Sequence, residues 1–341
     1  MPEQLPPAPR RPAGHSPLRR PNSVRRTSSI DMCWPQGMGK PARFAGRARD
    51  VYTGPDGGAP IPIAEDALEA DVAPDRTVLA IETRPARAQA AGLVGARGGD
   101  YLRKVLNERL PAEREAGTAL YLLIDDLSGA SLVSGWAWSR WTDRWMQRAH
   151  EYKSADEERA ARRSRMESVC IGFRPGSSAL TDLHGADQNH APVLPLPNPD
   201  DPQGWHAFTE NEGVSMRRAR RIDQWRDGAM VRIDATFQDS ASVPEGGRVA
   251  IHEYLLDVRV DAATMTVASV TPDPRILPYR ECPSAVGNVG RLVGTPVRDL
   301  RNTVLVELRR VLGCTHLNDA LRALAEVPLL LAHLDRLGPA A

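Results

Sequence analysis

Apolar and polar residues alternate with a period of two in two stretches of the second half of the chain, 230–237 and 253–261. This period places every second side chain on the same face, so it predicts antiparallel β-strands. The period then changes, because Leu300, Val304 and Leu308 keep the spacing of one helix face. Strands followed by helices predict an α+β fold rather than the alternating order of a Rossmann fold.

The two halves of the chain look like copies of one another. Three pairs of segments match in the same order: Arg25–Asp31 with Arg217–Asp223, Gly46–Asp50 with Ala235–Asp239, and Leu93–Gly95 with Leu292–Gly294. Ordered matches of this kind predict an internal duplication that gives two domains, each an antiparallel sheet with helices, the first copy being degenerate. The alternative is that two α+β blocks share only generic strand patterns.

Composition divides the chain into four parts. Residues 1–24 are rich in proline and arginine and lack an apolar period, so we predict a disordered tail that can be removed without loss of stability. Residues 25–180 form the degenerate copy, which includes a tryptophan-rich helix over 136–145. Residues 181–204, rich in Pro, Asn and Asp, form a linker. Residues 205–335 form the α+β domain with the candidate site.

Charge and composition exclude several classes of protein. Lysine and arginine number 44 against 43 acidic residues, so the net charge of +1 gives no support for nucleic-acid binding. The chain has no apolar run long enough to cross a membrane, and its start has no apolar secretory core. We therefore predict a cytoplasmic protein, and the strong preference for arginine over lysine indicates a GC-rich bacterial genome. The partner is an unknown small molecule or protein.

Two of the four cysteines stand at predicted helix starts. Cys282 precedes Pro283, a favoured first helical residue, and Cys314 follows a glycine turn that opens the next helix. Unpaired N–H groups at a helix start favour a thiolate, which is a metal ligand or a nucleophile. His316 follows two residues after Cys314, and His252 interrupts a strand. Two cysteines and two histidines suit zinc or iron, so we predict a metal site formed by these four residues.

Two other interpretations stay open. In the first, the protein is a non-catalytic accessory or binding protein whose cysteines, including Cys170, are structural. In the second, Cys314 is a nucleophile with His316 as its base. No glycine-rich phosphate-binding motif follows a strand, so nucleotide binding has no support. The first copy has Ile124 and Asp126 at the positions of Cys314 and His316, so only the second copy is expected to hold a site.

Three motifs of the second half indicate a family. Glu281–Pro283 (ECP), Arg291–Gly294 (RLVG) and Gly313–Leu317 (GCTHL) together resemble a bacterial family of unknown function, over about 217–325. That resemblance implies no established activity.

The order of the candidate ligands is also remotely similar to NifU-like iron–sulfur scaffold proteins. This resemblance places His252 at an aspartate ligand, Cys282 at the middle cysteine, and Cys314 and His316 at the closing pair. Ala250 stands where the scaffolds have their first cysteine, so the resemblance implies a mononuclear metal site rather than cluster assembly. The sequence thus predicts a cytosolic metal-binding protein, either a metal-dependent enzyme or a scaffold.

Overall fold

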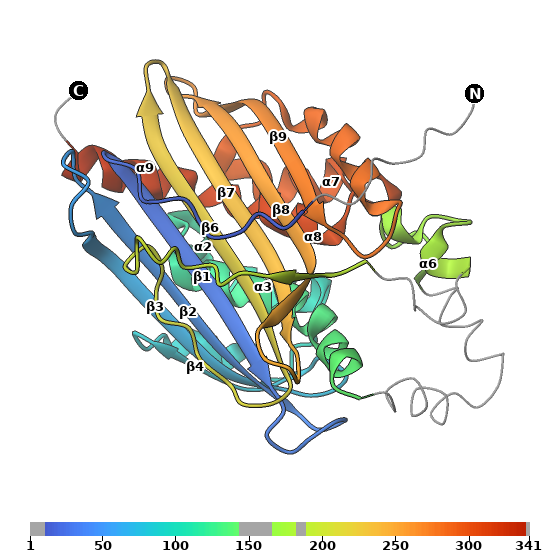
Figure 1. The fold of residues 1–341 in the computed structure, drawn as a ribbon. Coiled ribbons are helices and arrows are strands. Elements are labelled where there is room, and N and C mark those ends of the chain that lie inside the picture. The colour runs from blue at the N-terminus through green and yellow to red at the C-terminus, as the bar shows by residue number, and fades with distance from the viewer. Residues whose placement is uncertain (1–10, 143–165, 182–188, 339–341) are drawn as a thin grey trace.

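The computed structural model describes residues 11–142, 166–181 and 189–338. Within these ranges the strands form one antiparallel sheet (Figure 1). The strands are β1 (Ser23–Cys33), β2 (Ala42–Thr53), β3 (Ile61–Val72), β4 (Val78–Arg84), β5 (Ala191–Val193), β6 (Ser215–Asp227), β7 (Met230–Ser242), β8 (Arg248–Asp261) and β9 (Thr266–Ile276). Their order is β4-β3-β2-β1-β6-β7-β8. The edge of β8 that does not face β7 pairs first with β5 and then, further along the strand, with β9.

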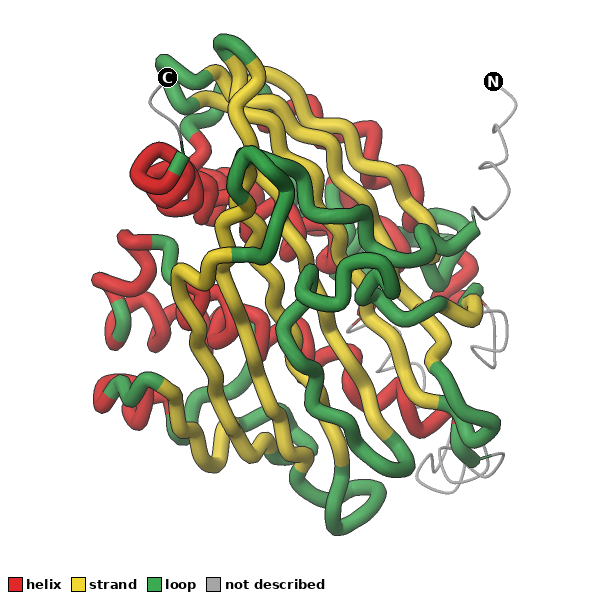
Figure 2. Tube along the Cα trace, turned by 60° about the vertical axis from the view of Figure 1, so that its left-hand side comes forward, coloured by secondary structure: helices red, strands yellow, loops and turns green. Residues whose placement is uncertain are grey.

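Helices cover one face of this sheet, while long loops cross the other (Figure 2). The α-helices are α1 (Asp100–Arg109), α2 (Pro111–Ala116), α3 (Ala119–Val133), α6 (Ser178–Thr181), α7 (Leu300–Glu307), α8 (Thr315–Arg322) and α9 (Val327–Leu337). The 3₁₀ helices are η1 (Ala88–Leu93), η2 (Ser134–Arg140), η3 (Ile171–Phe173), η4 (Cys282–Leu292), η5 (Val297–Asp299), η6 (Arg310–Leu312) and η7 (Ala323–Glu326). The α+β prediction is confirmed.

The predicted helices of the second half are present but shorter and more divided than their apolar spacing suggested. The helix predicted from the spacing of Leu300, Val304 and Leu308 is α7, which ends at Glu307 and is flanked by the short 3₁₀ helices η5 and η6, and η4 also has 3₁₀ geometry. The tryptophan-rich helix over 136–145 lies only partly within the described residues. There, η2 ends at Arg140, and Trp141 Nε1 donates a hydrogen bond of 2.8 Å to the carbonyl of Ser242 on β7.

The apolar core has two large parts on the helical face. One lies between β6–β9 and the helices from η4 onward, and the other lies between β1–β4 and the helices from η1 to η2. Helix α3 is buried along almost its whole length, including Asp125 and Asp126. The two apolar clusters therefore enclose charged side chains, which need partners because an isolated buried charge is costly.

The two central strands, β1 and β6, are buried on both faces although their sequences are rich in Arg, Ser and Thr. They pair antiparallel, so that Arg25 stands opposite Asp223 and Asp31 opposite Arg217. Both pairs are ion pairs of 2.5 Å, which compensates for removing these charges from water. The matched segments of the two halves thus lie side by side at the centre of the sheet.

Residues 11–22 cross the loop-covered face of the sheet, although composition placed them in a disordered tail. The Ser16 amide donates to the carbonyl of Leu196 at 2.9 Å, and Trp205 Nε1 donates to Ser16 Oγ at 2.9 Å. Arg19 forms an ion pair of 2.9 Å with Asp201. The sequence expectation fails here because it considered only apolar periodicity, whereas polar contacts with the predicted linker and the residues after it hold this segment.

Candidate metal centre

Arg218 is the centre of a buried charge network under the helices. It lies on β6, and its Nε and Nη2 donate to the two carboxylate oxygens of Asp239 on β7, at 2.8 and 3.0 Å. Its third nitrogen, Nη1, donates to Asp319 on α8 at 2.9 Å. A guanidinium bound at both edges has a fixed orientation, so Arg218 fixes the Asp239 carboxylate in turn.

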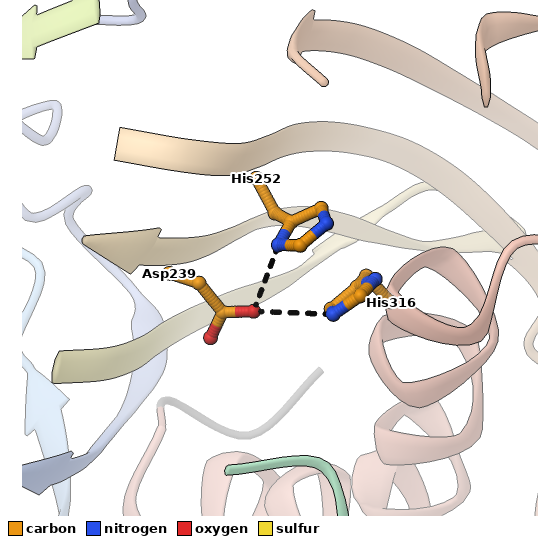
Figure 3. A group of neighbouring side chains, drawn as sticks. All are labelled: Asp239, His252 and His316. Atoms are coloured by element: carbon orange, nitrogen blue, oxygen red, sulfur yellow. Dashed lines mark ion pairs between the residues drawn. The ribbon is translucent and has the colours of Figure 1, made fainter. Parts of the chain in front are cut away.

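Two histidines lie against the same carboxylate (Figure 3). His252 stands on β8 directly opposite Asp239 in the strand register, and His316 lies in the first turn of α8. Asp239 Oδ2 is 3.3 Å from His252 Nδ1 and 3.6 Å from His316 Nε2. The side chain of Asp239 is fully buried, and those of the two histidines are 7% and 12% exposed. A strand pairing and a helix start thus bring three potential ligands to one point.

The two imidazole nitrogens that face Asp239 are left without a well-aligned hydrogen bond, although both are buried. The rings of His252 and His316 are stacked, with centroids 3.3 Å apart and planes inclined by 17°. Buried polar atoms normally have partners, because a missing partner costs about 1–3 kcal/mol. The arrangement is therefore a small polar site whose nitrogens and oxygen converge.

Burial sets the protonation of these groups. It lowers the pKa of His252 and that of His316, and for His316 the neighbouring His252 ring lowers the pKa further. Burial by itself would raise the pKa of Asp239, but Arg218 and the two histidines together outweigh it, and the pKa falls below its ordinary value. Two neutral imidazoles and one carboxylate result, which is the protonation state that metal ligands require.

The remaining nitrogen of His316 has contacts of its own. His316 Nδ1 lies 3.2 Å from Thr315 Oγ1. If Nδ1 carries the proton and donates it to the hydroxyl, Nε2 presents a lone pair toward Asp239. A bound imidazole commonly has such a partner on its second nitrogen.

The structure divides the four predicted ligands. His252 and His316 come together, and Cys314, the N-cap of α8, adjoins them with its Sγ 4.0 Å from His316 Nδ1. That nitrogen faces away from Asp239, so Cys314 lies beside the centre. Cys282, the first residue of η4, lies in the apolar core that also includes Cys314. Among the described residues, the ligand atoms that lie within 4.8 Å of one another belong to Asp239, His252 and His316.

The predicted effect of the helix starts on the cysteines is outweighed by burial. Burial raises the pKa of Cys282 well above its ordinary value and also raises the pKa of Cys314. Both are therefore thiols at neutral pH unless a cation replaces the proton. This weighs against the interpretation of Cys314 as a free nucleophile with His316 as base.

Asp239 was not among the predicted ligands. Its one sequence signal was the match with Asp50 in the first half, which the structure explains. Asp50 lies on β2 and accepts hydrogen bonds from Arg26 Nε at 2.7 Å and Nη2 at 2.6 Å, as Asp239 does from Arg218. The residue opposite Asp50 on the next strand is Ala64, whereas His252 is opposite Asp239. The first half therefore has the arginine–aspartate pair without the histidine.

Residues 216–329 match a family described as a protein of unknown function, DUF2889. The match includes every residue of the centre, from Arg218 to His316. No curated protein and no solved structure matches the chain. Within the part of the chain that the structure describes, no helix has both the length and the apolar composition needed to cross a lipid bilayer.

Proposed function

We propose that this protein binds a divalent transition-metal ion, zinc or iron(II), through Asp239, His252 and His316. The observation that supports this most directly is the pair of buried imidazole nitrogens that face one carboxylate oxygen without well-aligned hydrogen bonds. A cation between these groups would supply the missing partner for both nitrogens and a further one for Asp239 Oδ2. Zinc binds such nitrogens and oxygens at about 2.0–2.2 Å, so a small inward movement of the side chains is sufficient.

The ligand set favours a mononuclear site with positions left open. Two histidines and one carboxylate are the ligands of many non-heme iron(II) sites, and three protein ligands also occur in catalytic zinc sites. Both histidine nitrogens lie against Asp239 Oδ2, so the carboxylate would bind the ion through this oxygen, while Arg218 holds its orientation. The remaining positions would be available to water or to a small ligand.

The low exposure of the three side chains restricts what can reach the ion. We infer a metal-dependent enzyme for a small substrate, or a protein that holds or delivers the ion. The second candidate function is a non-catalytic accessory protein with structural cysteines, and the packing of Cys282 and Cys314 in the apolar core favours it. Metal content separates the two.

The test is elemental analysis of the full chain after purification without chelators. We expect Asp239→Asn and His252→Ala each to lose one equivalent of zinc or iron relative to the wild type. His206→Gln is the matched control, because His206 is also buried but lies on the other side of the sheet, against Ser29. A wild type that contains no metal and takes up none on incubation with Zn²⁺ or Fe²⁺ would refute the proposal.

An iron–sulfur cluster, the cargo suggested by the similarity to NifU-like scaffolds, is a distinct outcome of the same experiment. Acid-labile sulfide in an amount equal to iron would support cluster binding. Iron or zinc without sulfide would support the mononuclear site, which is the expected result because nitrogen and oxygen ligands dominate the centre.

We also propose that the two halves arose by internal duplication and that only the second kept the centre. The reciprocal ion pairs Arg25–Asp223 and Arg217–Asp31 support this, as does a strand irregularity next to both Asp50 and Asp239. We expect an experimentally determined structure to superpose residues 25–135 on 217–325 with these residues at equivalent positions. Unrelated positions would contradict the duplication.

A further inference from the structure

The described part of the tryptophan-rich helix forms one wall of a pocket at the end of β1. This pocket has a volume of about 290 Å³. Three separate segments line it: the turn after β1 with Trp34, η2 with Trp138, and the loop before β6 with Glu212. None of its lining residues belongs to the candidate metal centre, so the pocket is a second site.

Trp34 and Trp138 form two walls of the pocket that meet at an angle. Their ring centroids are 5.6 Å apart, and their planes are inclined by 61°. Both side chains are only half-buried, so part of each ring is open to a ligand in the pocket. Two aromatic rings inclined to one another are the main element of an aromatic cage, which binds a cation against the ring faces.

These walls are held in place by contacts within the protein. The Ser242 hydroxyl on β7 donates to the carbonyl of Gly213 at 2.8 Å and accepts from Trp141 Nε1 at 3.1 Å. It therefore joins the loop before β6 to the end of η2. Trp34 packs against the apolar cluster between β1–β4 and their helices. A pocket formed in advance loses less conformational freedom when a ligand binds.

The pocket is negatively charged. Among its described lining residues Glu212 alone has a charged side chain, because Cys33 remains a thiol whose pKa burial raises. Glu210 forms an ion pair of 3.4 Å with Arg217, whereas Glu212 forms no ion pair with any described residue. An unpaired carboxylate beside two indole rings favours a cationic ligand over an anionic one.

Trp225, at the other end of β6, shows what the rings of the pocket lack. Arg20 and Arg232 lie over the Trp225 ring, 4.6 and 5.8 Å from its centroid. Over the part of the chain that the structure describes, no such cation lies over Trp34 or Trp138. These two rings therefore have room for a cation from outside the protein.

We propose that this pocket binds a small organic cation that carries a methylated ammonium group. The indole rings would attract its charge, Glu212 would balance that charge, and Pro35 and Val214 would contact its methyl groups. A fully methylated ammonium has no N–H group that needs an acceptor, which suits walls that are mostly apolar. Pockets for small molecules begin at about 300 Å³, so the volume favours a ligand of few atoms.

The test is calorimetric titration of the full chain with choline, which has a trimethylammonium group, and with its uncharged carbon analogue, which has a tert-butyl group instead. The two probes have nearly the same shape, so their difference isolates the charge. We expect choline to bind, and the analogue to bind at least about tenfold more weakly, because the rings and Glu212 attract only the cation. This comparison needs no variant and therefore does not depend on how a substitution affects folding.

Variants then assign the binding to the pocket. We expect Trp138→Leu to weaken choline binding about fivefold or more. Glu212→Gln changes an exposed loop residue and is expected to weaken binding about threefold at low salt and little at high salt, because salt screens an exposed charge. Trp225→Leu is the matched control and is expected to leave the affinity unchanged, because Arg20 and Arg232 already lie over that ring.

The same group also occurs on methylated lysine side chains, so a short peptide that contains trimethyllysine is the third probe. Tighter binding of choline than of the peptide would support a free small molecule. Tighter binding of the peptide would overturn this assignment in favour of a protein partner. Absence of choline binding to the wild type at millimolar concentration, equal binding of choline and its uncharged analogue, or unchanged binding in a folded Trp138→Leu variant would overturn the proposal.

Discussion

Replacing His206 with glutamine is expected to make the stability of the protein less sensitive to acid. His206 is 7% exposed and lies on the loop-covered face of the sheet. Its Nε2 is 2.8 Å from Ser29 Oγ, and its Nδ1 is 2.8 Å from Thr27 Oγ1. Burial, aided by the nearby Arg49, lowers the pKa of His206 from 6.5 to about 3. The folded protein therefore keeps the ring neutral where the unfolded chain protonates it.

The sign and the size of the effect follow from this difference. As pH falls through 6.5 the unfolded state gains a proton that the folded state does not take up until about pH 3, so stability falls across that interval. Each pKa unit corresponds to about 1.4 kcal/mol. His206 is therefore expected to lower the free energy of unfolding by about 2 kcal/mol between about pH 7 and about pH 5. A glutamine can still hydrogen-bond to both hydroxyls but does not titrate.

The assay is urea unfolding of the wild type and of His206→Gln at the two pH values. In the wild type, the difference in the free energy of unfolding between the two pH values includes the contribution of every titrating group. Comparison with the variant isolates the contribution of His206. We expect the variant to lose about 2 kcal/mol less than the wild type on acidification. An equal loss in both proteins would refute the reasoning, because the folded state would then protonate His206 as readily as the unfolded state.

Two further substitutions test the buried charges and the N-terminal segment. In Gly129→Ala, the new methyl group would overlap Arg218 Nη1 and Asp319 Oδ2, so we expect a loss of about 3 kcal/mol or more in urea unfolding. Gly135→Ala is the control, because no atom lies within 4 Å of its added carbon, and an equal loss there would contradict the explanation. We expect Arg19→Ala to lower the thermal midpoint by several degrees through loss of the buried pair with Asp201. Arg43→Ala breaks an exposed pair and is expected to change little, so similar midpoints for the two variants would count against a packed segment.

Local periodicity was sufficient to predict the strands over 230–237 and 253–261, because each has one face in the core. It was insufficient for β1 and β6, which are buried on both faces without being apolar. A strand that is buried on both faces normally has a continuous run of apolar residues in its sequence. Arg25 and Arg217 are buried because each has an aspartate on the neighbouring strand, and such partners become visible only once the strands are paired.

Local sequence patterns were likewise insufficient to predict the whole candidate metal centre. His252 was predicted as a ligand because it interrupts a strand pattern. His316 was predicted as a ligand because it follows a predicted helix start. Asp239 was missed because its importance depends on the register that places it opposite His252 and on the arginine that holds it. Cys282 was assigned to the same site as the histidines on the basis of helix starts alone. Spacing along the chain could not show that its sulfur lies in the apolar core with Cys314.

The pairing of β1 with β6 also has a consequence for how the chain folds. Arg25 and Asp223 are 198 positions apart, so the centre of the sheet is among its least local contacts, whereas the hairpins on either side are local. Non-local pairs form slowly, because a long loop must close first. During synthesis β1 is thus an exposed edge strand until β6 emerges. The charges of Arg25 and Arg26 then disfavour pairing of this edge with other chains. In the completed sheet the same two residues form buried ion pairs.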